Sequence, residues 1–168
     1  MKLNVATELK LPGREGHAVL CERIEDIEYP GRWIRFADDV TVEINYVFDG
    51  SGFETSGSVK TALKGECARC AKELTVPFAH EFEERFEKNA PEDGAYPFSG
   101  EELDLSDLVR DTILLNMENY VLCKDDCRGL CPVCGCDLNT VQCSCEQEAE
   151  DDNPFAKLKA LFNEDKEV

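Results

Sequence analysis

The first half of the chain alternates apolar and polar residues with the period of two that is typical of β-strands. Residues 40–48, VTVEINYVF, have an apolar side chain at every second position, and residues 53–63 and 74–86 repeat the pattern. Between the first two runs lies Asp49-Gly50-Ser51-Gly52, whose residues tolerate positive φ, so we expect a hairpin there. The pattern predicts an antiparallel β domain over residues 1–90, either a sheet or a partly closed barrel, with one solvated face.

Two further details of these runs lead to expectations. The opening residues place Leu3, Val5 and Leu9 on one parity, which predicts a strand there as well. Cys21 lies in the apolar run HAVLCERI, so we expect it to be a small buried residue.

The hydrophobic period changes from two to 3.6 after a loop at residues 91–100. Asp104 is a candidate N-cap for an amphipathic helix, which would complete a segment at 91–122. A Cys-rich segment follows at 123–145, and an acidic linker and a short C-terminal helix are expected at 146–168. The strands followed by helices predict the α+β class. The residues with helical spacing are Leu105, Leu108, Val109, Thr112 and Ile113.

Length and composition narrow the class of protein. With 168 residues the chain can form one ordinary core and a small appended module. The opening residues have no continuous apolar run, so we expect no signal peptide and a cytoplasmic location. Ten cysteines in that reducing compartment indicate metal or redox chemistry more than disulfides.

The formal net charge of −18 argues against broad binding of phosphate backbones, because such binding depends on Lys and Arg. It favours attraction to basic partners. Solubility alone is the plainer interpretation of the same charge.

Seven of the ten cysteines lie within residues 123–145. In the CPVCG sequence of residues 131–135, two sulfurs can turn toward one ion, and the glycine lets the backbone N–H groups point at the thiolates. A second pair follows a few residues later. The spacing predicts a closed four-sulfur site typical of structural zinc, with the ligands Cys131, Cys134, Cys143 and Cys145.

A separate pair, Cys67 and Cys70, follows a predicted strand. A thioredoxin-like motif would begin a helix in a βαβ unit, whereas strands are predicted on both sides here. We therefore expect half of a second zinc site, completed by Cys123 and Cys127. Cys136 is left over and is expected to bind no metal.

An iron–sulfur cluster and histidine ligands are the alternatives to this scheme. The end of a ferredoxin motif resembles Cys127-x3-Cys131-Pro132, but the preceding spacing does not fit an iron–sulfur cluster, which favours zinc. His17 and His80 could also serve as ligands. His80 shares its parity with phenylalanines, which favours a core histidine.

Catalytic signatures were not found in the sequence. It has no recognisable nucleophile–base pair, phosphate-binding loop or carboxylate-rich metal motif. A closed four-sulfur site leaves no open coordination position. The sequence predicts a non-enzymatic protein; a zinc-ribbon protein–protein adaptor and a thiol oxidoreductase using Cys67 and Cys70 are the alternatives.

Several motifs together resemble the YceD family over residues 64–168: LKGECARCAKEL, then CRGLCPVCGCDLNTVQCSC, then DDNPFAKLKALF. The resemblance implies a role in the large ribosomal subunit, in the accumulation or processing of 23S ribosomal RNA, with no catalytic activity attached. The expected partners are the pre-50S ribosomal particle, 23S rRNA and a basic large-subunit ribosomal protein. The resemblance assigns the same cysteines to the motifs, except Cys136.

Direct RNA contact would need a local basic patch. The stretch YPGRWIRF offers Arg32, Trp33 and Arg35, in which an aromatic ring between two arginines could stack on an unpaired base. The alternative, which we favour from the sequence, is a Trp packed on the core with solvated arginines.

Overall fold

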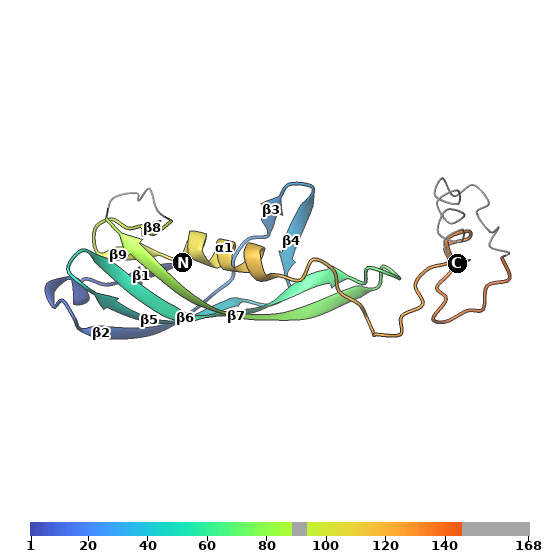
Figure 1. Cartoon of the computed structure of the whole chain (residues 1–168), viewed down its shortest axis with the longest axis horizontal. Helices are drawn as coiled ribbons and strands as arrows, with labels where there is room; N and C mark the ends of the chain where they lie inside the picture. Colours follow the sequence, from blue (N-terminus) through green and yellow to red (C-terminus); the bar gives the residue numbers. More distant parts are fainter. Residues whose placement is uncertain (89–93, 146–168) are drawn as a thin grey trace, which may run out of the picture. The chain divides into compact units, whose positions relative to one another are not determined.

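The structure is a computed structural model that describes residues 1–88 and 94–145. Most of the described chain forms antiparallel sheet, with one α-helix and a Cys-rich region after it (Figure 1). This confirms the α+β class. In chain order the elements are β1 (Lys2–Asn4), the 3-10 helix η1 (Glu8–Lys10), β2 (Glu15–Glu22), β3 (Ile27–Tyr29), β4 (Arg32–Phe36), β5 (Val40–Phe48), β6 (Gly52–Glu66), β7 (Glu73–Glu87), β8 (Tyr96–Pro97), β9 (Glu102–Asp104) and α1 (Ser106–Asn116).

The main sheet has the order β2-β5-β6-β4-β3, and β7 pairs with β6. The long hairpin of β6 and β7 dominates it, with Glu66 opposite Glu73 next to the tip and Gly52 opposite Glu87 at the other end. Strands β1 and β9 form a separate two-stranded sheet. In the described residues β2 does not pair with β7, so the sheet is open and the expected alternative of a partly closed barrel does not form.

The predicted hairpins form where the alternation placed them. Every second residue of β5 is buried, beginning at Val40 and ending at Phe48. In the turn that follows, the Asp49 carboxylate accepts hydrogen bonds from the N–H groups of Ser51 (2.7 Å) and Gly52 (2.8 Å). These two donors, Gly52 first, hold the pKa of Asp49 well below its usual range. The turn therefore fixes the register of β5 against β6.

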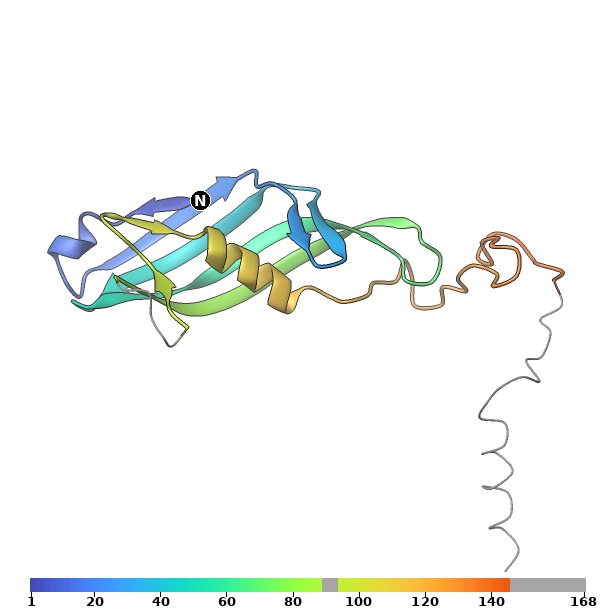
Figure 2. The same ribbon diagram turned by 90° about the horizontal axis from the view of Figure 1, so that it is seen from above.

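Helix α1 packs its apolar side on one face of the sheet (Figures 1 and 2). The Asp104 carboxylate accepts the N–H of Ser106 at 3.0 Å, one position before the cap position itself, which Leu105 occupies. The predicted capping role is therefore shifted by one residue. The helix buries Leu108, Val109, Thr112 and Ile113.

Three local expectations are wrong. The strand predicted from Leu3 ends at Asn4, and the chain then turns, with Leu9 N–H bonded to the Val5 carbonyl at 3.1 Å. Val5 and Leu9 are four residues apart, so an alternating pattern also fits a helical turn. Cys21 is exposed rather than buried, because its parity within β2 points away from the core. His80 is also exposed, although Phe78 and Phe82 on the same parity of β7 are buried.

The described chain falls into two compact units, residues 1–127 and residues 128 onward. In the second unit a small bridge joins Leu130 and Asp137, and the N–H of Leu138 donates to the Gly129 carbonyl at 2.9 Å. The short C-terminal helix predicted within residues 146–168 lies outside the described residues. Among those described, no helix combines the length and the apolar character needed to span a membrane.

Candidate metal centre

The first cysteine group is built on the tip of the β6–β7 hairpin. The two strands end at Glu66 and Glu73, so Cys67 and Cys70 are both in the connecting turn. The N–H of Cys67 donates to the Lys72 carbonyl at 2.9 Å, which closes the turn. A hairpin of paired strands therefore presents both thiols at one end.

The segment after α1 brings the other two thiols to this tip. Val121 pairs with Cys67 in a parallel bridge, and its carbonyl accepts the N–H of Ala68 at 2.9 Å. These contacts place Cys123 and Cys127 against the turn. The Arg69 guanidinium adds a second link, because it donates to the Cys127 carbonyl at 2.9 Å and to the Asp125 carbonyl at 3.3 Å.

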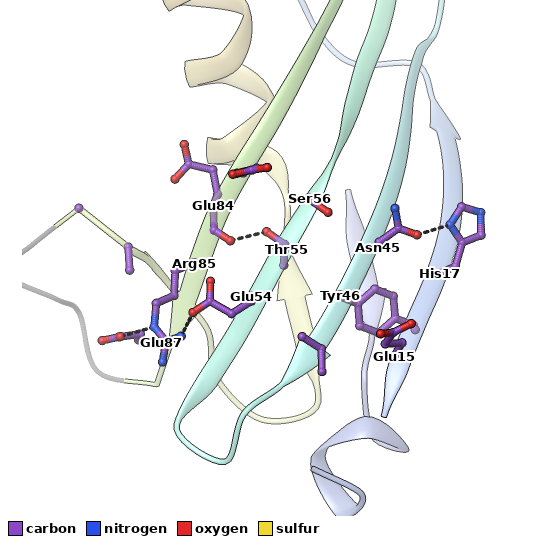
Figure 3. Close-up of a pocket in the computed structure, with 15 residues that line it drawn as sticks. Glu15, His17, Asn45, Tyr46, Glu54, Thr55, Ser56, Glu84, Arg85 and Glu87 are labelled. Atoms are coloured by element: carbon purple, nitrogen blue, oxygen red, sulfur yellow. Dashed lines mark hydrogen bonds and ion pairs between the residues drawn. The ribbon is translucent and has the colours of Figure 1, made fainter. Parts of the chain in front are cut away.

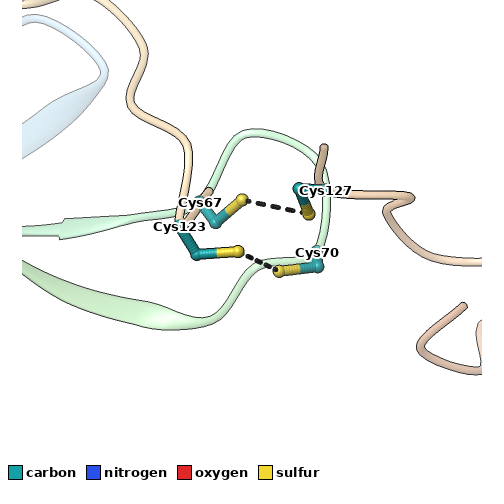
Figure 4. Close-up of side chains that lie close together, drawn as sticks. All are labelled: Cys67, Cys70, Cys123 and Cys127. Carbon is teal, nitrogen blue, oxygen red and sulfur yellow. Dashed lines mark hydrogen bonds between the residues drawn. The ribbon is translucent and has the colours of Figure 1, made fainter. Parts of the chain in front are cut away.

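The four sulfurs of this hairpin group, Cys67, Cys70, Cys123 and Cys127, all lie within 4.8 Å of one another (Figure 4). The sulfurs of Cys67 and Cys127 are 3.8 Å apart, and those of Cys70 and Cys123 are 3.7 Å apart. A tetrahedral zinc site with its usual Zn–S distance has S–S edges of about 3.8 Å. The group therefore has the dimensions of a four-thiolate metal site, in the ligand set expected from the sequence.

The second group lies in the unit that begins at residue 128. Its mutually close sulfurs belong to Cys131, Cys134, Cys136 and Cys143, within 4.8 Å of one another. The Cys143 sulfur is 3.4 Å from that of Cys131 and 3.5 Å from that of Cys134. We call these four residues with Cys145 the ribbon group.

The ribbon group differs from the expected ligand set at one position. Cys136, expected to be a bystander, is within the four close sulfurs, and Cys145 is not. Cys145 remains nearby, because its N–H donates to the Cys143 sulfur at 3.3 Å. Five thiols thus gather where a tetrahedral ion takes four.

Both CxxC turns have the same backbone structure. Ala71 and Gly135, each directly after the second cysteine of its motif, have φ values of 56° and 73°. Each donates its N–H to the carbonyl of the first cysteine, Cys67 or Cys131, at 2.8 Å. The shared turn explains why both motifs aim two sulfurs at one point.

The repeated turn also shows what the sequence analysis missed about Cys136. In the hairpin group the N–H of Cys67 is accepted by the Lys72 carbonyl, and in the ribbon group the N–H of Cys131 is accepted by the Cys136 carbonyl at 2.8 Å. Cys136 therefore holds the position of Lys72 in the turn. A comparison of the two motifs as one repeated turn would have placed its side chain beside the knuckle.

The electrostatics of both groups are those of crowded thiols. Burial opposes ionisation of Cys67, but N–H groups, that of Cys123 foremost, outweigh it and lower the pKa of Cys67 to about 6. The N–H of Cys136 is the main cause that lowers the pKa of Cys134 to about 6. Burial raises the pKa of Cys123 to about 12. One thiol of each group thus ionises readily, and its neighbours resist ionisation. A bound cation would relieve the repulsion among several thiolates in one group.

The two histidines are in neither sulfur group. His17, on strand β2, bonds through Nδ1 to the Asn45 side-chain oxygen at 2.9 Å. It lines the acidic groove, a hollow of about 1380 Å³ over β2, β5, β6 and β7 (Figure 3). Arg85, the cation of this groove, pairs with three carboxylates, those of Asp49, Glu54 and Glu87.

The stretch expected to contact RNA lies on β4. Trp33 is 56% exposed, so the Trp is not packed on the core as we favoured from the sequence. Arg35 is exposed beside it, and both line a groove of about 830 Å³ with Lys64 and Tyr120. The groove also contains three carboxylates, those of Glu66, Glu73 and Glu118. Of Arg32 only the backbone is described.

The fold and its sulfur groups define a class: an open antiparallel sheet with one covering helix and two thiol clusters of metal-site dimensions. Within that class, the profile of the family described as large ribosomal RNA subunit accumulation protein YceD matches residues 55–162, more than half of the chain. The chain belongs to the YceD family.

Individual relatives match over shorter stretches. A maize protein described as large ribosomal RNA subunit accumulation protein YCED homolog 1, chloroplastic, is 34% identical over 40% of this chain and 22% of its own length. The Arabidopsis thaliana protein of the same description is 34% identical over 33% of this chain and 17% of its own. An uncharacterized Mycobacterium tuberculosis protein is 32% identical over 52% and 45%. The chain thus spans less than half the length of these relatives. No solved structure matches the chain.

Proposed function

We propose that this protein is a non-enzymatic assembly factor of the large ribosomal subunit that supports the accumulation of 23S rRNA and acts in the cytoplasm. The observation that carries the proposal is membership of a family described by large ribosomal RNA subunit accumulation. The two thiol clusters support a role without catalysis, since four thiolates around one ion leave no open coordination position for a substrate.

Zinc is the metal that we propose for both clusters. Thiolate sulfur is a soft donor, and tetrahedral four-sulfur sites are typical of zinc and of iron–sulfur proteins. The sulfur separations of 3.7 and 3.8 Å in the hairpin group fit a single ion. Cys67, Cys70, Cys123 and Cys127 would hold one zinc, and the ribbon group would hold another. The metal would join the hairpin tip to the segment after α1, 53 residues further along the chain at Cys70 and Cys123.

The surface charge favours a basic protein as the direct partner. In the proposed role, this protein would meet that partner in the pre-50S particle. In the acidic groove, the five lining glutamates outnumber Arg85, which is already paired with three carboxylates. A large-subunit ribosomal protein rich in Lys and Arg would gain from that potential, both in association rate and in specificity.

Direct contact with 23S rRNA is a second candidate, favoured by one observation. Trp33 and Tyr120 are 56% and 71% exposed around one groove, in reach of Arg35 and Lys64. Exposed aromatic rings beside cations are suited to stacking on unpaired bases. The three carboxylates of the same groove limit its affinity for phosphates.

The proposal is tested by sedimentation of extracts from cells that carry a tagged copy, with a deletion strain in parallel. We expect the tagged protein to co-sediment with pre-50S particles, and the deletion to lower 23S rRNA relative to 16S rRNA. If the protein stays at the top of the gradient and 23S rRNA is unchanged, the adaptor alternative replaces the proposal. Thiol oxidoreductase activity would instead appear as reduction of a disulfide substrate that Cys67→Ser abolishes.

A further inference from the structure

The ribbon group has one thiol more than a tetrahedral ion can bind. Cys131, Cys134, Cys136 and Cys143 are mutually within 4.8 Å, and Cys145 interacts with the sulfurs of Cys143 and Cys134 from outside that set. The hairpin group, by contrast, consists of four thiols, and the position equivalent to Cys136 is Lys72. The two groups therefore differ in the number of thiols and share the same turn.

We propose that the ribbon group is an oxidant-reactive zinc site, in which Cys136 is the fourth ligand and Cys145 is a free thiol held next to the ligand Cys134. This rests on the proposed zinc. The proposal gives the ribbon group a site of cysteine oxidation, Cys145, that the hairpin group lacks.

The position of Cys145 suits this role. It is exposed, so that a small oxidant such as hydrogen peroxide can reach it, whereas Cys131 and Cys127 are buried. Its backbone is fixed near the cluster by the 3.3 Å hydrogen bond from its N–H to the Cys143 sulfur. Exposure and a neighbouring thiol that can resolve the oxidised form are two of the features of a redox-sensitive cysteine. The sulfurs of Cys143 and Cys134 raise the pKa of Cys145 in the metal-free chain, and a bound zinc would withdraw their negative charge.

The reaction consumes one peroxide for each pair of thiols. The Cys145 thiol loses its proton, and the thiolate attacks one oxygen of the peroxide and breaks the O–O bond. This gives the sulfenic acid of Cys145 and a hydroxide, which takes up the released proton as the first water. The Cys134 thiolate then attacks the sulfenic sulfur, forming the Cys134–Cys145 disulfide, and with one proton the displaced hydroxide leaves as the second water. Two thiols are oxidised and the peroxide is reduced to two waters. A zinc bound at the ribbon group would then be held by three thiolates, those of Cys131, Cys136 and Cys143.

Loss of one thiolate opens a coordination position and weakens the hold on the ion, so a chelator can remove it. The hairpin group has no fifth thiol among the described residues and keeps its four ligands. Peroxide should therefore release one zinc per chain quickly and leave the other in place.

The test begins with alkylation of the zinc-loaded full chain, followed by peptide mapping. The free thiols, Cys21 and Cys145, are expected to react, and Cys136 to be protected. Modification of Cys136 with protection of Cys145 would overturn the assignment. The metal content measured on the same sample separates this outcome from a failure of the zinc proposal, because a chain without zinc would have reactive thiols in both groups.

The second step measures zinc release with a chromogenic chelator under hydrogen peroxide. Cys145→Ser keeps the four close thiols of the ribbon group and should still load close to two zinc per chain. It removes the spare thiol, so the fast release should slow by about tenfold or more. Cys21→Ser, which changes an exposed thiol outside both groups, is the matched control and should release zinc as the unchanged chain does. Equal release rates in all three proteins would refute the proposal.

Discussion

The guanidinium of Arg69 donates a hydrogen bond of 2.9 Å to the backbone carbonyl of Cys127, across 58 residues of sequence. Arg69 lies between the two thiols of the first CxxC motif, and Cys127 is the last thiol of the same cluster. The bond therefore ties together the two chain segments that supply the four sulfurs. Arg69 would therefore act as a positioning residue for the proposed zinc, through the thiols that it holds together.

Replacement of Arg69 by Met should lower the zinc affinity of the hairpin group by about ten- to a hundredfold, the usual effect of losing a partner that orients a ligand. Competition with a calibrated chelator measures this. Lys72→Met, in the same turn, is the control, because Lys72 contributes its backbone carbonyl and not its side chain. Equal affinities of the two variants would show that the guanidinium does not position the site.

The purified chain should contain close to two zinc, by elemental analysis. Cys67→Ser and Cys131→Ser should each remove about one, because each leaves a group without a buried ligand. Cys136→Ser should remove none, because Cys145 interacts with the same two sulfurs as Cys136, those of Cys134 and Cys143, and can take its place. One zinc in the unchanged chain would contradict one of the two sites, and none would contradict both.

Removal of the zinc should loosen residues 128–145 before the sheet. The ribbon segment buries few apolar side chains, so the proposed zinc would supply most of its folding free energy, whereas the sheet has its own core. Hydrogen exchange with and without a chelator measures this. Simultaneous loss of protection in β5 and in the ribbon would contradict it.

The metal-free chain should lose stability as the pH falls from 9 toward 6. The pKa of Cys67 is lowered to about 6 in the folded state from an ordinary 9.0, and a group with a depressed folded pKa stabilises the fold above its unfolded pKa. That contribution disappears as the pH falls through the folded value. Denaturant unfolding at several pH values measures it, and Cys67→Ser should flatten the dependence in this window.

Gly57→Ala should destabilise the fold by roughly 2–3 kcal/mol, because an added Cβ would lie 2.0 Å from the Glu43 carbonyl oxygen on the paired strand. Gly65→Ala is the matched control in β6, since its Cβ would meet side-chain atoms at ordinary distances of 3.5 and 3.6 Å. Thermal unfolding compares the two. Equal melting temperatures would show that β5 and β6 can separate at Gly57 without cost.

Trp33→Ala and Arg35→Ala should each weaken binding to 23S rRNA fragments by about fivefold or more if the groove stacks an unpaired base. Filter binding at fixed salt measures this. Val19→Ala is the control, because Val19 is similarly exposed, at 61%, on another strand. Unchanged affinity in both variants would leave a basic protein as the direct partner.

The sequence by itself determined the strands β5, β6 and β7, the helix α1, and the four thiols that meet in the hairpin group. The alternation in residues 40–48 specifies which side chains of β5 are buried, because successive side chains of a strand point to opposite faces of the sheet. Periodicity was ambiguous at Val5 and Leu9, where spacings of two and four coincide. It was also wrong about Cys21 and His80, which are exposed, because apolar neighbours in a strand do not determine whether another element covers a given side chain.

Tertiary structure decided the choice of thiols in the ribbon group. Spacing along the chain counts cysteines but does not give the direction of their sulfurs, and from spacing alone we chose Cys145 and left out Cys136. The positive φ of Gly135 turns the chain so that Cys136 returns to the knuckle and its carbonyl accepts the N–H of Cys131. The hydrogen bond from Arg69 to the Cys127 carbonyl also could not be predicted from the sequence, because only the folded chain brings the hairpin tip next to the segment after α1.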